Sequence, residues 1–143
     1  MNQHTINILE FPQLIKIIQD YAKSSPGRDR LAKFKPQNDF RRAFRMTPLI
    51  KALLEIRQKV DDFPGEDFYS PELLLTKMAP NGAVLDSLEL HVIGRLLKVS
   101  DKVRRFVNRD SFKEYSALTI LKDGLCDYKD ILERYDLVFD ERG

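Results

Sequence analysis

Arginine is the residue type whose spacing in this sequence points most directly to chemistry. A guanidinium group presents a rigid fork of N–H donors that matches phosphate oxygens, and contacts of this kind are independent of base sequence and weakened by salt. Two closely spaced triplets are present, one between positions 41 and 45 and one between 104 and 109. We consider these six side chains candidate contacts to nucleic-acid phosphates: Arg41, Arg42, Arg45, Arg104, Arg105 and Arg109.

Further cations surround both triplets, and their arrangement has more than one interpretation. The segments 28–45 and 95–113 each contain seven basic and two acidic side chains. In the second segment, steps of three and four residues place five cations in one stripe along a helix. They are Arg95, Lys98, Lys102, Arg105 and Arg109. Such a stripe is a phosphate-binding face, the solvated side of a helix, or a surface that meets the acidic C-terminal segment.

The residue types that usually carry catalysis or bind metals form no recognisable pattern. Cys126 is the single cysteine, and the flanking Asp123 and Asp127 oppose formation of a thiolate, so we expect a small, partly buried core residue. His4 and His91 are isolated in the sequence. No phosphate-binding glycine loop, nucleophile elbow or zinc-protease motif is present. We therefore expect a chain that is not itself an enzyme and that has no catalytic, cofactor-binding or metal-binding residues.

Length and composition indicate one globular domain. The chain has 143 residues, of which 43% are hydrophobic and 32% charged, enough for one domain with a buried core. The net charge of +2 combines +7 in residues 1–60 with −5 in residues 61–143. No apolar run approaches the roughly 18 residues of a membrane span, and the N-terminus lacks a signal-peptide pattern. We expect a cytoplasmic chain that does not contact membranes.

The apolar spacing predicts an all-α chain, an orthogonal or irregular bundle of about six helices. The first helix is predicted over residues 11–23 and the second over 28–34. Asn38 is the predicted N-cap of a third helix that reaches residue 60, and Pro48 should kink it or divide it into two. Shorter helices are predicted over 71–78, 117–122 and 127–135, the first of them with Ser70 as its N-cap.

The helix predicted over residues 87–107 is the most strongly specified. Asp86 and Glu89 have the spacing of a capping box, and one apolar seam follows with steps of three and four residues. The seam comprises Val92, Leu96, Val99, Val103 and Phe106. Six of the nine phenylalanines either stack on bases or belong to the core, and we favour the core. This set comprises Phe40, Phe44, Phe63, Phe68 and Phe112, together with Phe106 of the seam.

Four blocks, taken in order, resemble the N-terminal region of the MutS family, most closely its second bacterial branch. The first runs from Leu9-Glu10-Phe11 to Tyr21-Ala22, and the second from Ser25-Pro26-Gly27-Arg28 to Lys35-Pro36. The third is Gly82-Ala83-Val84-Leu85-Asp86 with Glu89-Leu90, and the last comprises residues 131–136 followed by Phe139-Asp140-Glu141-Arg142-Gly143. The resemblance covers nearly the whole chain. Pro48 departs from it, because the family usually has an acidic residue near that position.

The resemblance implies that residues 1–143 form a single helical core domain, with the lever and ATPase domains outside this segment. Family members are ATP- and Mg-dependent, dimerise, and act on mismatched or branched DNA, and one branch acts on stalled ribosomes. The implied partners are therefore DNA, other domains of the parent protein and, for the branch that acts on stalled ribosomes, the ribosome. The segment itself would be monomeric within a homodimeric parent. An alternative, suggested by the +7 and −5 halves, is a free-standing helical adaptor that binds protein or RNA through a basic helix face.

Overall fold

The computed structural model describes residues 8–36 and 39–139, and this part of the chain is all-α, as predicted. It contains seven α-helices and two short 3₁₀ helices, and no strand occurs among the described residues. None of the described helices combines the length and apolar character needed to cross a bilayer. The predictions for His4 and for Asn38 as an N-cap lie outside the described residues.

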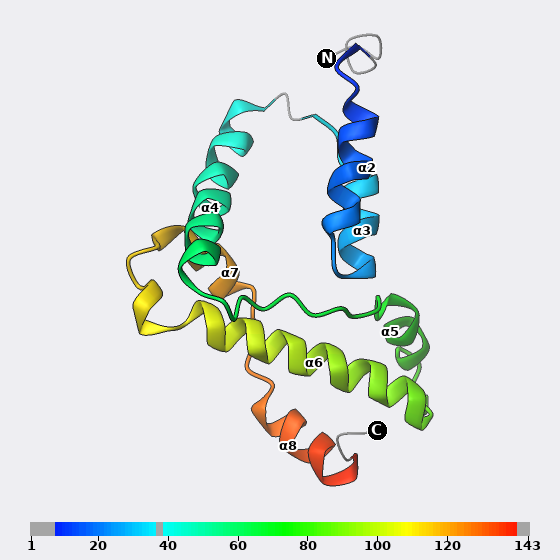
Figure 1. Ribbon diagram of the computed structural model, residues 1–143. Helices are drawn as coiled ribbons and strands as arrows, with labels where there is room; N and C mark the ends of the chain where they lie inside the picture. The colour runs from blue at the N-terminus through cyan, green and yellow to red at the C-terminus, as the bar shows by residue number, and fades with distance from the viewer. Residues whose placement is uncertain (1–7, 37–38, 140–143) are drawn as a thin grey trace.

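The N-terminal part is a helical hairpin of α2 (Phe11–Tyr21) and α3 (Ser25–Ala32), which lie side by side in Figure 1. The side chain of Ser24 caps α3, because its Oγ accepts a hydrogen bond from the Gly27 N–H at 3.3 Å. Pro26 in the first turn suits a helix start, since no backbone N–H is required there. For these reasons α3 begins earlier than the sequence predicted.

Helix α4 (Phe40–Lys59) runs continuously through Pro48, so of the two predicted outcomes, a kink or a division into two helices, the division is wrong. The proline removes one backbone donor, yet the turn before it has an additional bond, because the Thr47 hydroxyl donates to the Ala43 carbonyl at 2.9 Å. Downstream of the proline, buried Leu49 and Ile56 hold the helix against the core. Tertiary packing therefore offsets the local cost of Pro48.

The core forms where the C-terminal halves of α4 and of α6 (Ser87–Val107) meet the segment that follows α6 (Figure 1). That segment comprises the 3₁₀ helices η1 (Asp110–Phe112) and η2 (Ser116–Leu118), then α7 (Thr119–Asp123). The buried cluster consists of Leu49, Ile56, Phe106, Val107, Phe112 and Leu118. The aromatic rings pack at its centre, with the centroids of Phe106 and Phe112 5.1 Å apart.

Helix α6 has the predicted bounds and the predicted capping box. Asp86 Oδ1 accepts from the Glu89 N–H and Glu89 Oε2 accepts from the Asp86 N–H, both at 2.9 Å. The predicted cap of α5 (Glu72–Met78) is wrong, because Pro71 is its N-cap and no side chain caps it. The Ser70 N–H instead donates to Ser25 Oγ at 3.2 Å, which ties the segment before α5 to the start of α3.

The last helix, α8 (Lys129–Val138), begins slightly later than predicted and lies beside α6 (Figure 1). Asp127 precedes it and accepts the Lys129 N–H at 3.0 Å through its carboxylate. No residue of α8 is buried. The core is thus confined to one end of α6, and several large apolar side chains on α2, α4 and α8 remain exposed.

Candidate nucleic-acid interface

The structure separates the six candidate arginines into two groups on different helices. Arg41, Arg42 and Arg45 lie in the first turns of α4, and Arg104, Arg105 and Arg109 lie at or just beyond the C-terminal end of α6. Arg41 and Arg45 are exposed, whereas the side chain of Arg42 lies outside the described part of the structure. The two groups do not form one continuous array, so they are two separate surfaces.

The α4 group is interleaved with an exposed aromatic pair. Phe40 and Phe44 are 76% and 66% exposed, and their ring centroids lie 5.8 Å apart. The prediction that these two phenylalanines belong to the core is therefore wrong, although it is right for Phe106 and Phe112. Within the described residues, neither Arg41 nor Arg45 forms an ion pair. Exposed rings beside uncommitted guanidinium groups suit base stacking and phosphate contact.

Phe63 and Phe68, the remaining members of the predicted aromatic set, are half-buried. The Phe63 ring packs edge-on against Phe106, with centroids 5.4 Å apart, and so belongs to the margin of the core. Both residues lie in the extended segment between α4 and α5. Neither is therefore placed to stack on a base as Phe40 and Phe44 are.

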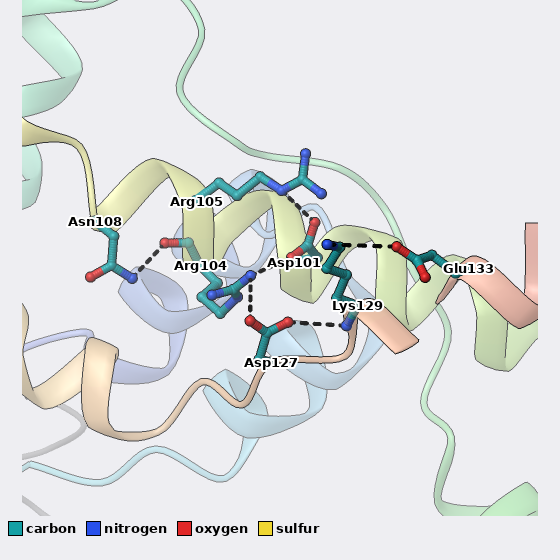
Figure 2. A network of polar contacts seen from close by, with 7 residues as sticks. All are labelled: Asp101, Arg104, Arg105, Asn108, Asp127, Lys129 and Glu133. Atoms are coloured by element: carbon teal, nitrogen blue, oxygen red, sulfur yellow. Dashed lines mark hydrogen bonds and ion pairs between the residues drawn. The ribbon is translucent and has the colours of Figure 1, made fainter. Parts of the chain in front are cut away.

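The α6 group is organised around Asp101, a carboxylate that is only 5% exposed. Asp101 accepts from Arg104 Nη2 at 3.1 Å and from Arg105 Nε at 2.7 Å, as Figure 2 shows. A buried charge must be paired to be tolerated, and two guanidinium groups from the next turn provide the pairing. Sequence reasoning did not single out Asp101, although its position three and four residues before two arginines was the available signal.

Acidic residues from the C-terminal segment cover a second part of the α6 surface. Arg104 also pairs with Asp127 at 3.2 Å (Figure 2), and Lys98 pairs with Asp136 at 2.7 Å. The Lys98 ammonium lies over the Tyr135 ring, 5.1 Å from its centroid. One cation of the stripe, Lys98, therefore meets the acidic C-terminal segment, as one of the interpretations left open above requires.

The loop between α4 and α5 covers two other stripe cations, Lys102 and Arg109. Arg109 Nη1 donates to Asp62 Oδ1 at 2.9 Å, and Lys102 pairs with Glu66. The hydrogen bond from Arg109 holds the pKa of the Asp62 carboxyl below its usual value. Arg109 also lies over the Phe106 ring, with its guanidinium carbon 4.7 Å from the centroid. Arg109 therefore connects the loop, through Asp62, to the core, through Phe106.

A groove of about 800 Å³ follows these contacts, with α6 as its floor. One wall comes from the loop at 62–66, and the other comes from α8. Both walls carry carboxylates, so the cations on the floor are largely neutralised by their own chain. A phosphate backbone would bind here by exchanging partners with these carboxylates rather than by occupying free cations.

Neither the cysteine nor the described histidine forms a catalytic arrangement. Cys126 is exposed, so the prediction of a partly buried core residue is wrong. The neighbouring Cys126 thiol raises the pKa of the Tyr128 phenol. His91 is half-buried, with Nδ1 3.1 Å from the Tyr135 hydroxyl. Across residues 8–36 and 39–139, no group of three or more His, Cys, Asp or Glu side chains is arranged to hold a metal.

This all-α chain is distantly homologous, over most of its length, to a MutS-family protein. That protein is Endonuclease MutS2. The chain is 26% identical to the Endonuclease MutS2 of Caldicellulosiruptor bescii over 141 residues, and these residues make up 97% of this chain. It is 29% identical over 112 residues, or 76% of the chain, to the one from Staphylococcus haemolyticus. The chain spans only 17% and 14% of the lengths of these two relatives. No family model and no solved structure matches it.

Proposed function

We propose that this chain is a non-catalytic helical core or connector domain of a MutS-like ATPase. In the full-length protein it helps to hold mismatched or branched DNA during mismatch repair or recombination control. The observation that carries the proposal is the similarity to Endonuclease MutS2 over 97% of this chain, at 26% identity. ATP hydrolysis, its Mg²⁺ requirement, dimerisation and any nuclease activity would belong to the rest of the parent protein.

The construction of α6 supports a mechanical role. Its 21 residues make a rod about 32 Å long at the usual rise per residue. The C-terminal end of α6 is packed into the core, and the N-terminal end is fixed by the capping box and by a Lys77–Glu89 ion pair at 2.6 Å. Coupling between distant sites needs rigid elements of this kind. A displacement at one end of α6 would therefore be transmitted to the other.

The test is binding of the 143-residue chain to a fluorescent four-way junction over a salt series. We expect dissociation constants in the micromolar range or weaker that rise steeply with salt, about the range of non-specific binding. Crosslinking should then map the DNA to Arg41, Arg42, Arg45, Arg104, Arg105 or Arg109. Tight binding that resists salt, or no binding at the lowest salt concentration, would contradict the proposal.

A second candidate function is the adaptor that binds RNA or protein. It is favoured by one observation, the exposed pair of Phe40 and Phe44 beside Arg41 and Arg45. Aromatic side chains of this kind stack on unpaired bases regardless of sequence. In the same assay, a single-stranded RNA that displaces the junction at lower concentration than an unlabelled junction would favour the adaptor. Stronger competition by the junction would favour the DNA-associated role.

A further inference from the structure

We infer that the acidic segment, residues 127–136, acts as an intramolecular substitute for phosphate on α6, and that a phosphate backbone reaches Lys98 and Arg104 only after α8 leaves. The inference rests on the proposed function in one respect, namely that the phosphate backbone is that of DNA. It adds a mechanism by which the chain controls access to its own basic surface.

Two carboxylates of the acidic segment take the place of phosphate groups on α6. Asp136 lies 2.7 Å from the Lys98 ammonium, and Asp127 lies 3.2 Å from Arg104 Nη2. Both cations belong to the basic surface of α6, and both carboxylates belong to the most acidic part of the chain. Carboxylate and phosphate oxygens take the same donors from arginine and lysine, so the two acids occupy the positions that phosphates would take.

The acidic segment is only lightly attached. No residue of α8 is buried, and the side chains of Asp127 and Asp136 are both more than half exposed. Ion pairs in contact with water are weak and are screened by salt. The other notable contacts come from Tyr135, whose hydroxyl meets His91 and whose ring packs against Gly94 and Lys98.

The rest of the fold does not depend on α8. The buried cluster and the side chains packed around it come from α4, α6 and the segments between residues 60 and 125, and none comes from α8. Asp101 would still hold Arg104 and Arg105 after release. Undocking of α8 therefore uncovers Lys98 and one face of Arg104 while the supporting structure stays folded.

A nucleic-acid backbone is a stronger competitor than the acidic segment. Duplex DNA carries one negative charge for every 1.7 Å or so of its axis, and neutralising these charges releases counterions. The acidic segment offers two carboxylates to the same surface. Exchange of α8 for DNA is therefore favoured at low salt. It becomes less favourable as the salt concentration rises, because counterion release then contributes less to the binding free energy.

The decisive comparison uses two double variants with the same change in charge. Asp127→Asn with Asp136→Asn removes both charges that pair with α6, and asparagine at 127 keeps an acceptor for the Lys129 N–H. Asp130→Asn with Glu133→Gln removes two charges of α8, one of which pairs with Lys129 in the same helix. The first variant should bind a four-way junction about threefold to tenfold more tightly than the second. Equal tightening would overturn the inference, because net charge alone would then explain it.

A second measurement separates this inference from the proposed function. Hydrogen exchange of the α8 amides should accelerate when long-chain inorganic polyphosphate is added, relative to sodium chloride of equal ionic strength. Amides at Ile56 and Val107 in the core should stay protected. Polyphosphate that fails to bind, or that binds while α8 stays protected, would overturn the inference. Release of α8 by polyphosphate without binding of any DNA would support the inference while contradicting the proposed function.

Discussion

Gly94 and the ring of Tyr135 are in such close contact that a Cβ atom on the glycine would lie 2.2 Å from two ring carbons. The absence of a side chain at position 94 is therefore what allows α8 to approach α6. Gly94 is itself buried in the middle of α6, where glycine lowers helix stability, so its presence is explained by the packing.

Gly94→Ala should displace α8. Alanine favours the helix by up to about 1 kcal/mol, but overpacking at a contact this close costs about 1–3 kcal/mol. The loss should therefore exceed the gain, and the α8 amides should exchange faster than in the wild type. Gly65→Ala is the matched control, since the nearest atom to its Cβ would be at 4.0 Å. Unchanged protection of α8 in Gly94→Ala would contradict the packing described here.

Two isoleucines of α4 should differ sharply when shortened. Ile56 is 0% exposed, and Ile56→Ala should lower the free energy of unfolding by about 2–5 kcal/mol through lost burial and a cavity. Ile50 on the same helix is 55% exposed, and Ile50→Ala should have a much smaller effect. Urea unfolding followed by circular dichroism measures both. Similar losses for the two variants would show that the core is not where the structure places it.

Asp101→Asn should destabilise the chain by about 1–3 kcal/mol, because it weakens charge-assisted hydrogen bonds to Arg104 and Arg105. The Arg104 Nε is buried and has no partner among the described residues, so that side chain has little capacity to compensate. The control is Asp110→Asn, which breaks an exposed pair with Lys113 and should leave urea unfolding unchanged. A result in which both variants unfold alike would exclude a special role for Asp101.

Stability should also depend on pH through Glu89. The hydrogen bond from Lys77, followed by the one from the Asp86 N–H, lowers the pKa of the Glu89 carboxyl below its usual value. A lowered pKa in the folded state means that the contribution is fully present above the unfolded glutamate value of about 4.3. It is then lost as the pH falls through the lower folded-state value.

The measurement is the unfolding temperature of the wild type and of Glu89→Gln between about pH 3 and pH 7. The difference between the two proteins should be constant at the neutral end and should shrink at the acidic end. Lys77→Gln should reduce the same difference, leaving the smaller contribution of the backbone donor. A difference that grows on acidification would have the wrong sign for a lowered pKa.

Local signals in the sequence were sufficient for α6. Asp86 and Glu89 fix its start through short-range hydrogen bonds, and the seam that ends at Phe106 fixes its buried face. The same kind of reasoning failed at Ser70, because Pro71 became the N-cap and Ser70 bonded to Ser25, a residue distant in sequence. The local sequence predicts a helix cap only where no residue distant in sequence competes for the hydrogen-bonding groups of the capping residue.

The candidate site was predicted only in part. Periodicity identified the basic stripe on α6, but not its pairing with Asp62 and Glu66, since the path of a loop depends on long-range contacts. Periodicity likewise places Phe40 and Phe44 on one face of α4 without revealing whether another element covers that face. Within the described structure they are exposed, and this could not be deduced from spacing alone.

Phe40, Phe44, Ile50 and Leu54 form an exposed apolar face of α4, which should affect the behaviour of the chain in solution. Phe40, Ile50 and Leu54 are all more than half exposed, so the helix exposes apolar surface to water along much of its length. The association state should therefore depend on protein concentration. We expect monomers at low concentration and reversible clustering as the concentration rises. Unlike the attachment of α8, clustering through this face should strengthen with added salt, because salt screens the repulsion among the α4 cations.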